Sequence, residues 1–121
     1  RQGSNLPDTF RVMANSILGM LRDANKALAD RDAGLARRGL AFDDTVTEFT
    51  HEILRHTQDR VAGGDLAVDG AFRVLAVTKS MERIADHCTN ICEQVIYLET
   101  GKIVRHDPDG WTEPQNPDVS T

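Results

Sequence analysis

The sequence has no proline between Asp8 and Asp107, because all four prolines lie at positions 7, 108, 114 and 117. Aromatic residues are also scarce: they make up 5% of the chain, with one Trp and one Tyr. Domains rich in β-structure use prolines in turns and aromatic or β-branched residues in strands. These two deficits therefore favour a mainly helical protein.

The sequence also lacks a long apolar run and an excess of positive charge. No stretch approaches the roughly 18 apolar residues that a membrane-spanning helix requires, so we expect no direct membrane insertion. Acidic residues outnumber basic residues by 19 to 14, which gives a net charge of −5. Binding to phosphate backbones needs basic surface, so we expect no nucleic-acid partner.

The length of 121 residues suits a single domain.

Only two cysteines are present, Cys88 and Cys92, four residues apart. On a helix they share one face, and this spacing suits neither a disulfide within the helix nor a zinc finger. We expect reduced thiols in a cytoplasmic protein, with both side chains in the core. A soft-metal or redox role is the alternative.

Apolar residues recur at steps of three and four in three segments, at residues 5–29, 34–61 and 68–100. Short connections between long helices make sequential helices antiparallel. The sequence therefore predicts an all-α fold, an up-down-up three-helix bundle. Its expected core positions in the second and third segments are Leu35, Phe42, Val46, Phe49, Ile53, Val74, Thr78, Met81, Ala85, Cys88, Cys92 and Val95, with Ile84 and Ile91 alongside.

The two ends of the chain differ from the middle in composition. We expect residues 1–4 to be disordered and the bundle to occupy residues 5–105. Residues 106–121 contain three of the four prolines and show no helical period, so they predict a flexible tail with Trp111 as its one large apolar residue.

A stripe of oxygen-bearing side chains runs along the third predicted helix. At about 100° per residue, four of them fall on one side, away from the core positions: Glu82, Asp86, Asn90 and Glu93. Carboxylate and amide oxygens are hard ligands for metal cations. The alternative is an ordinary solvated helix face, since Lys79 and Arg83 lie beside the stripe.

The second predicted helix also carries acidic residues. On its helical wheel Asp43 and Thr47 flank the core stripe, whereas Asp44 and Glu48 point away from it. A site shared with the third helix would therefore use Asp43, with Thr47 as a further candidate. Glu48 and His51 have the Glu-x-x-His spacing of di-iron proteins, but this single copy points away from the bundle interior.

The run from Met81 to Glu93, MERIADHCTNICE, continues to Val104-Arg105-His106 and resembles the last helix of a PhoU repeat. The residues from Met20 to Ala36 are similar to the first helix and turn of the same repeat. The resemblance covers about residues 5–106. Members of this family are usually about twice this length and hold two three-helix repeats, of which this chain resembles the second.

The resemblance implies a regulator and not an enzyme. Proteins of this family are cytoplasmic and peripheral to the inner membrane. They couple a phosphate ABC transporter to a sensor histidine kinase and repress the phosphate-starvation response when phosphate is plentiful. A single repeat leaves exposed the face that a first repeat would cover, so we expect a homodimer.

The resemblance also implies a metal site between the second and third helices. Family members pair carboxylates across these helices, where iron or other metals bind. Carried over to this chain, the implied ligands are Asp43, Glu82, Asp86 and Asn90, and the candidate metals are iron, zinc, nickel and magnesium. Thr47 stands where a second carboxylate is common in the family, which removes one ligand. Ala85 replaces the usual glycine and narrows the space beside the stripe.

Two other functional classes remain open from the residues alone. One is a metal-dependent enzyme or a metal store, which the single outward Glu-x-x-His copy supports poorly. The other is a structural helical module that docks a partner and binds no metal.

Overall fold

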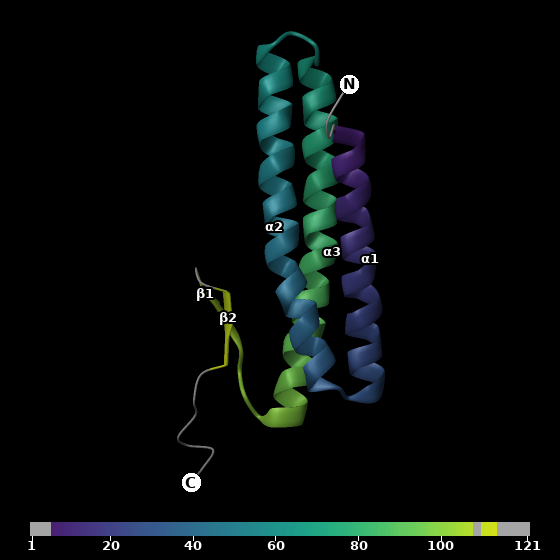
Figure 1. The fold of residues 1–121 in the computed structure, drawn as a ribbon, viewed down its shortest axis with the longest axis vertical. Helices are drawn as coiled ribbons and strands as arrows, with labels where there is room; N and C mark the ends of the chain where they lie inside the picture. The colour runs from purple at the N-terminus through teal and green to yellow at the C-terminus, as the bar shows by residue number, and fades with distance from the viewer. Residues whose placement is uncertain (1–5, 108–109, 114–121) are drawn as a thin grey trace.

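The computed structural model describes residues 6–107 and 110–113. In this part of the chain three helices are followed by a short hairpin. The elements are α1 (Leu6–Asp30), α2 (Ala33–Ala62), α3 (Val68–Thr100), β1 (Arg105–Asp107) and β2 (Gly110–Thr112). All three helices pack on one another, and α3 lies between α1 and α2 in the view of Figure 1. The predicted all-α, three-helix bundle is confirmed, with every helix end within a residue of its expected position.

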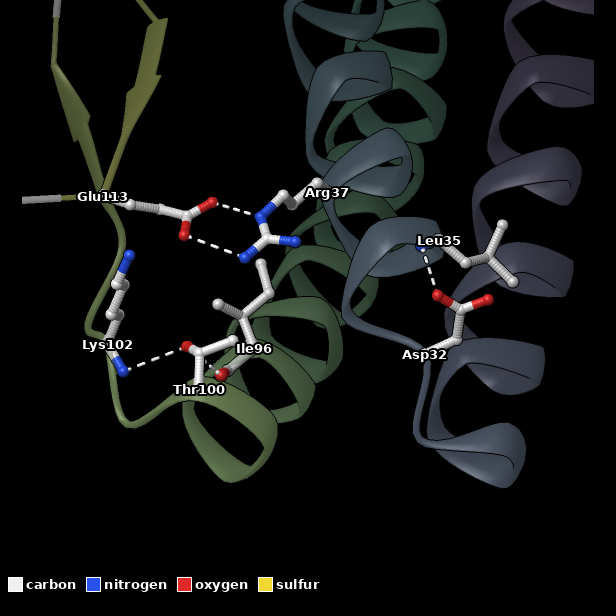
Figure 2. A network of polar contacts seen from close by, with 7 residues as sticks. All are labelled: Asp32, Leu35, Arg37, Ile96, Thr100, Lys102 and Glu113. Atoms are coloured by element: carbon white, nitrogen blue, oxygen red, sulfur yellow. Dashed lines mark hydrogen bonds and ion pairs between the residues drawn. The ribbon is translucent and has the colours of Figure 1, made fainter.

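The turns are stabilised by local capping interactions. Asp32 precedes α2, and its side chain accepts a hydrogen bond from the backbone N–H of Leu35 at 3.0 Å (Figure 2). This bond satisfies one of the donors that a helix start leaves without a partner. Gly101 ends α3 in the left-handed conformation, with φ 74°, and donates its backbone N–H to the carbonyl of Tyr97. Glycine adopts that conformation without steric cost.

The core runs along the axis of the bundle between the three helices. Its largest fully buried side chains are Met13, Met20, Leu40, Ile53, Ile96, Val95, Cys88 and Cys92. Two expected core positions are wrong, because Phe42 is 38% exposed and Ile84 is 44% exposed. The buried face of α2 follows Gly39, Thr50 and Thr57 instead. Glycine and threonine carry little apolar signal, so hydrophobicity alone placed that face too close to Phe42.

One glycine sets the distance between α2 and α3. A Cβ atom added to Gly39 would lie 2.7 Å from the Sγ atom of Cys92, far inside contact distance. The two helices therefore approach each other more closely here than any side chain on residue 39 permits. Cys92 fills the space that the missing side chain leaves.

The hairpin replaces part of the tail that the sequence predicts. β1 and β2 pair in antiparallel fashion, with Arg105 opposite Thr112 and Asp107 opposite Gly110. Trp111 packs against the core cluster, which includes the buried Val104. These contacts with distant residues provide the stabilisation that a three-residue strand lacks alone. The structure therefore places strands within the segment predicted as a flexible tail, whose flexibility stays a prediction. The predicted disordered residues 1–4, and residues 108–109 and 114–121 of the tail, lie outside the described part of the chain.

An ion pair joins the hairpin end to α2. The guanidinium of Arg37 donates two hydrogen bonds to the carboxylate of Glu113, one of them from Nη2 to Oε1 at 3.0 Å (Figure 2). Two parallel bonds between these planar groups fix their relative orientation. The hairpin thus lies along α2, to one side of the bundle (Figure 1).

None of the helices within residues 6–107 is both long enough and apolar enough to cross a membrane.

Candidate functional site: a cleft between α2 and α3

An open cleft of about 430 Å³ separates α2 from α3. Its lining residues are Asp43, Val46, Thr47, Thr50, Lys79, Glu82, Arg83, Ala85 and Asp86. The cleft brings together three of the four predicted metal ligands, Asp43, Glu82 and Asp86. Asn90, the fourth, is exposed on α3 and does not line the cleft.

Helical spacing places these side chains on facing surfaces. On α2, positions 43, 47 and 50 follow at steps of four and three. On α3, Lys79 and Asp86 each lie three or four residues from both Glu82 and Arg83, so each set shares one side of its helix. Ala85 is 1% exposed and forms part of the cleft wall. The Thr47 hydroxyl donates to the carbonyl oxygen of Asp43 at 3.0 Å, within its own helix. That hydroxyl can still accept a bond from a molecule in the cleft.

The charges in the cleft are mixed. The carboxylates of Asp43, Glu82 and Asp86 line the cleft together with Lys79 and Arg83. Within residues 6–107 and 110–113, no three His, Cys, Asp or Glu side chains come close enough together to hold a metal ion. The carboxylates line one cleft without converging on one point, and two cationic side chains line it with them.

Glu93, the fourth member of the stripe, lies apart from the cleft. It is half-buried beside a hollow that Tyr97, Ile103 and Val104 also line, where the chain folds back after α3. Burial raises the pKa of the Glu93 carboxyl, and the negative charge of Asp43 raises it further. The helical wheel places Glu93 on the same side of α3 as Glu82. The structure adds that Ile103 and Val104, which follow α3, lie beside Glu93 on that side.

The two cysteines are structural in this fold. Both are free, and both have an exposed fraction of 0%. Burial raises the pKa of the Cys92 thiol to about 11, with smaller contributions from Cys88, Asp23 and Glu93, and burial also raises the pKa of Cys88. A thiol that stays protonated and enclosed is a poor nucleophile and a poor metal ligand.

The Glu-x-x-His copy on α2 lies where the sequence places it. Glu48 and His51 are both exposed, so they do not point into the bundle. Lys79 and Arg83 also line the cleft, whereas the sequence predicted them only as neighbours of the oxygen-bearing stripe. Their place in the cleft could have been predicted from the sequence, because they lie one helical turn from Glu82 and Asp86 on the same side of α3.

The sequence of this chain matches a family of known proteins. The family described as "PhoU domain" matches residues 10–95. The phosphate-specific transport system accessory protein PhoU homolog 1 of Thermotoga maritima is 38% identical over 93 residues, which is 77% of this chain and 40% of that protein. The Pseudomonas putida homolog is 34% identical over 96 residues, 79% of this chain and 38% of its own length.

The shared region contains the cleft. Asp43, Glu82 and Asp86 all lie within residues 10–95, whereas the hairpin lies beyond them. No solved structure matches the chain. The chain spans about two fifths of the length of the curated relatives it matches. Because the family match covers most of the bundle, this chain belongs to the PhoU domain family.

Proposed function

We propose that this protein is a non-enzymatic regulator of phosphate uptake and of phosphate-starvation signalling. The observation that carries the proposal is the family match over residues 10–95, together with relatives that are named as accessory proteins of phosphate-specific transport. In this role the bundle acts through contacts with a phosphate ABC transporter and a sensor histidine kinase. It works in the cytoplasm, at the inner membrane, and is held there by these partners.

The bundle has the properties of a docking module. Three long helices pack around one core, and the cleft between α2 and α3 presents charges of both signs to a partner. Complementary charges guide association and choose between partners more than they add affinity. We therefore assign the cleft residues Glu82 and Asp86 to the contact with a partner protein.

Affinity purification of the chain from membranes of the source organism tests these partners. We expect a phosphate ABC transporter subunit and a sensor histidine kinase among the proteins that mass spectrometry identifies. Glu82→Ala with Asp86→Ala should reduce their recovery at least tenfold. Glu48→Ala with Asp59→Ala is the matched control, since it removes two exposed charges outside the cleft. Recovery of neither partner with the unaltered chain would contradict the proposal.

Metal binding in the cleft is a second, separable proposal. The chemistry of the donors suits hard divalent cations, since Asp43, Glu82 and Asp86 offer carboxylate oxygens. Their spacing and the nearby Lys79 and Arg83 do not suit a cluster of several metals. We propose at most one weakly held cation, with Asn90 outside the site.

Elemental analysis and calorimetric titration with magnesium, zinc, iron and nickel separate this proposal from a metal-free docking module. Binding should weaken at least tenfold in the Glu82→Ala, Asp86→Ala variant and stay unchanged in Asn90→Ala. If no metal binds, or if the double variant binds as well as the unaltered chain, the metal proposal is wrong.

A further inference from the structure

An apolar groove lies between α2 and α3, toward the turn that joins the two helices at the top of Figure 1. It has a volume of about 580 Å³, and its apolar lining consists of Leu54, Phe72, Leu75 and Ala76. Phe72 is 66% exposed and Leu54 is 38% exposed. Large apolar side chains that stand open beside a hollow are typical of surfaces that bind another protein.

The apolar groove continues into the charged cleft. Thr50, Lys79 and Glu82 line both hollows, so the two form one surface along α2 and α3. On α3 this surface extends from Phe72 to Asp86, which is about 21 Å at 1.5 Å per residue. It is apolar toward the α2–α3 turn and charged toward the middle of the bundle. A depression of this length between two antiparallel helices has the shape into which a further helix packs.

The charges around this surface favour a basic occupant. In the lining of the cleft, carboxylates outnumber cationic side chains by three to two. On α2, residues 39–54 carry no lysine or arginine but four acidic side chains, those of Asp43, Asp44, Glu48 and Glu52. An acidic surface attracts a basic partner and repels an acidic one. A second copy of this chain, with its net charge of −5, is therefore a poorer occupant than a basic segment.

We propose that the apolar groove and the cleft together bind an amphipathic helix of a partner protein. Its large apolar side chains pack against Phe72 and Leu54, and its lysines or arginines lie one to three turns further along, beside Glu82 and Asp86. The apolar contacts supply affinity, and the charges select the partner and set the direction of its helix. The inference rests on the proposed function, because it names the kind of segment that the partner presents to these two carboxylates.

A synthetic peptide tests the binding of such a helix to the unaltered chain. The probe is a fluorescein-labelled helical peptide about 18 residues long, with Leu and Phe in one half of its contact face and Lys in the other half. Fluorescence anisotropy, measured with EDTA present so that no metal competes for the carboxylates, gives the dissociation constant. We expect binding that weakens as salt is added. A peptide with Glu in place of Lys, and one of the same composition in scrambled order, should bind about tenfold more weakly or less.

Variants of the chain locate the contact. Phe72→Ser should weaken binding about tenfold, because it removes the most exposed apolar anchor of the groove. Its matched control is Val77→Ser, since Val77 is 49% exposed on α3 but does not line the groove. Glu82→Gln with Asp86→Asn should also weaken binding about tenfold, whereas Asp30→Asn with Asp59→Asn, which removes two exposed charges elsewhere, should not.

Nuclear magnetic resonance of the ¹⁵N-labelled chain shows where the peptide lies. The unlabelled peptide should shift the backbone amides of residues 50–54 and 72–86 most strongly. Circular dichroism verifies that each variant is folded, and Ala76→Glu replaces Phe72→Ser if that variant unfolds, because Ala76 is exposed and lines the same groove.

Three results would overturn the inference: a basic peptide that does not bind, a folded groove variant that binds it as tightly as the control, or amide shifts confined to other parts of the chain. Equal recovery of the transporter subunit and the kinase by Phe72→Ser and by the unaltered chain would overturn it too, while the proposed function stands. Recovery of neither partner by the unaltered chain would contradict the proposed function, and the peptide titration would still decide the inference.

Discussion

At the scale of single residues, the packing of α2 on α3 requires glycine at position 39. A Cβ atom at this position would lie 2.7 Å from the Sγ atom of Cys92. In an interior packed to crystal-like density, an added Cβ would have to displace the Cys92 side chain or push the two helices apart. The contact therefore links the packing of α2 on α3 to two small residues.

We expect Gly39→Ala to lower the free energy of unfolding by about 1–2 kcal/mol, since an overpacking cost of roughly 1–3 kcal/mol outweighs the gain in helix propensity. Urea denaturation followed by circular dichroism measures the change. Gly19→Ala is the control, because nothing lies within 4 Å of its added Cβ; it should stabilise the helix by up to about 1 kcal/mol. Gly39→Ala should regain stability when combined with Cys92→Ala. An unchanged stability in Gly39→Ala would contradict the close approach.

The two thiols make a second prediction at this scale. Because Cys88 and Cys92 are fully buried and the pKa of Cys92 is raised to about 11, neither should react with a disulfide reagent at neutral pH while the protein is folded. Both should react at once in denaturant. The reagent releases a coloured thiol when it reacts, so absorbance measures the reaction rate in the folded and in the denatured protein. Rapid labelling of the folded protein would contradict a structural role for Cys88 and Cys92.

At the scale of elements, the hairpin depends on its ion pair with α2. The Arg37 guanidinium bonded to Glu113 lowers the pKa of that carboxyl below its ordinary value of 4.5. A carboxyl with a lowered pKa in the folded state stabilises docking above the ordinary value, and this stabilisation is lost as pH falls through the lowered one. The hairpin should therefore be held less tightly to α2 once the pH falls below the ordinary pKa of a glutamate carboxyl.

Trp111 reports on this separation, because it is the one tryptophan in the chain. Its emission should shift to longer wavelength as pH falls. Glu113→Gln should show that shift already at neutral pH, because the amide keeps no charge for Arg37. Glu99→Gln is the control, since it breaks a different ion pair, with Arg31, and should leave Trp111 unchanged. A pH profile equal in all three proteins would show that the ion pair does not hold the hairpin.

The helices were predictable from the sequence and the hairpin was not. Long apolar periods and the breaks at Asp32 and Gly63 are local signals, so every helix end was found within a residue. The strands are three residues long and depend on contacts such as Arg37 with Glu113, which are 76 residues apart. No local pattern encodes a pairing at that separation.

The candidate site was predictable only in part, for a related reason. A helical wheel shows which side chains share a direction, and it placed Asp43, Glu82 and Asp86 correctly on facing sides of two helices. Convergence of their oxygens depends on the distance and tilt between α2 and α3, which a wheel does not contain. Asn90 shares the direction of Glu82 but lies beyond the end of the cleft.

At the scale of the whole molecule, the bundle presents two surfaces of different character. The α2–α3 cleft is open and lined by charged side chains, whereas the outer side of α3 carries exposed apolar side chains, among them Val77, Ile84 and Leu98. The family match over residues 10–95 includes the cleft residues, Val77 and Ile84, and ends before Leu98.

The most direct test of the account measures phosphate-starvation gene expression in the source organism. Deletion of the gene for this protein should raise a starvation-dependent reporter in phosphate-rich medium, and a restored copy should return it to the repressed level. A copy with Glu82→Ala and Asp86→Ala should fail to restore repression, while one with Glu48→Ala and Asp59→Ala should succeed. A reporter that stays repressed after deletion would contradict the central claim that this bundle regulates the response to phosphate.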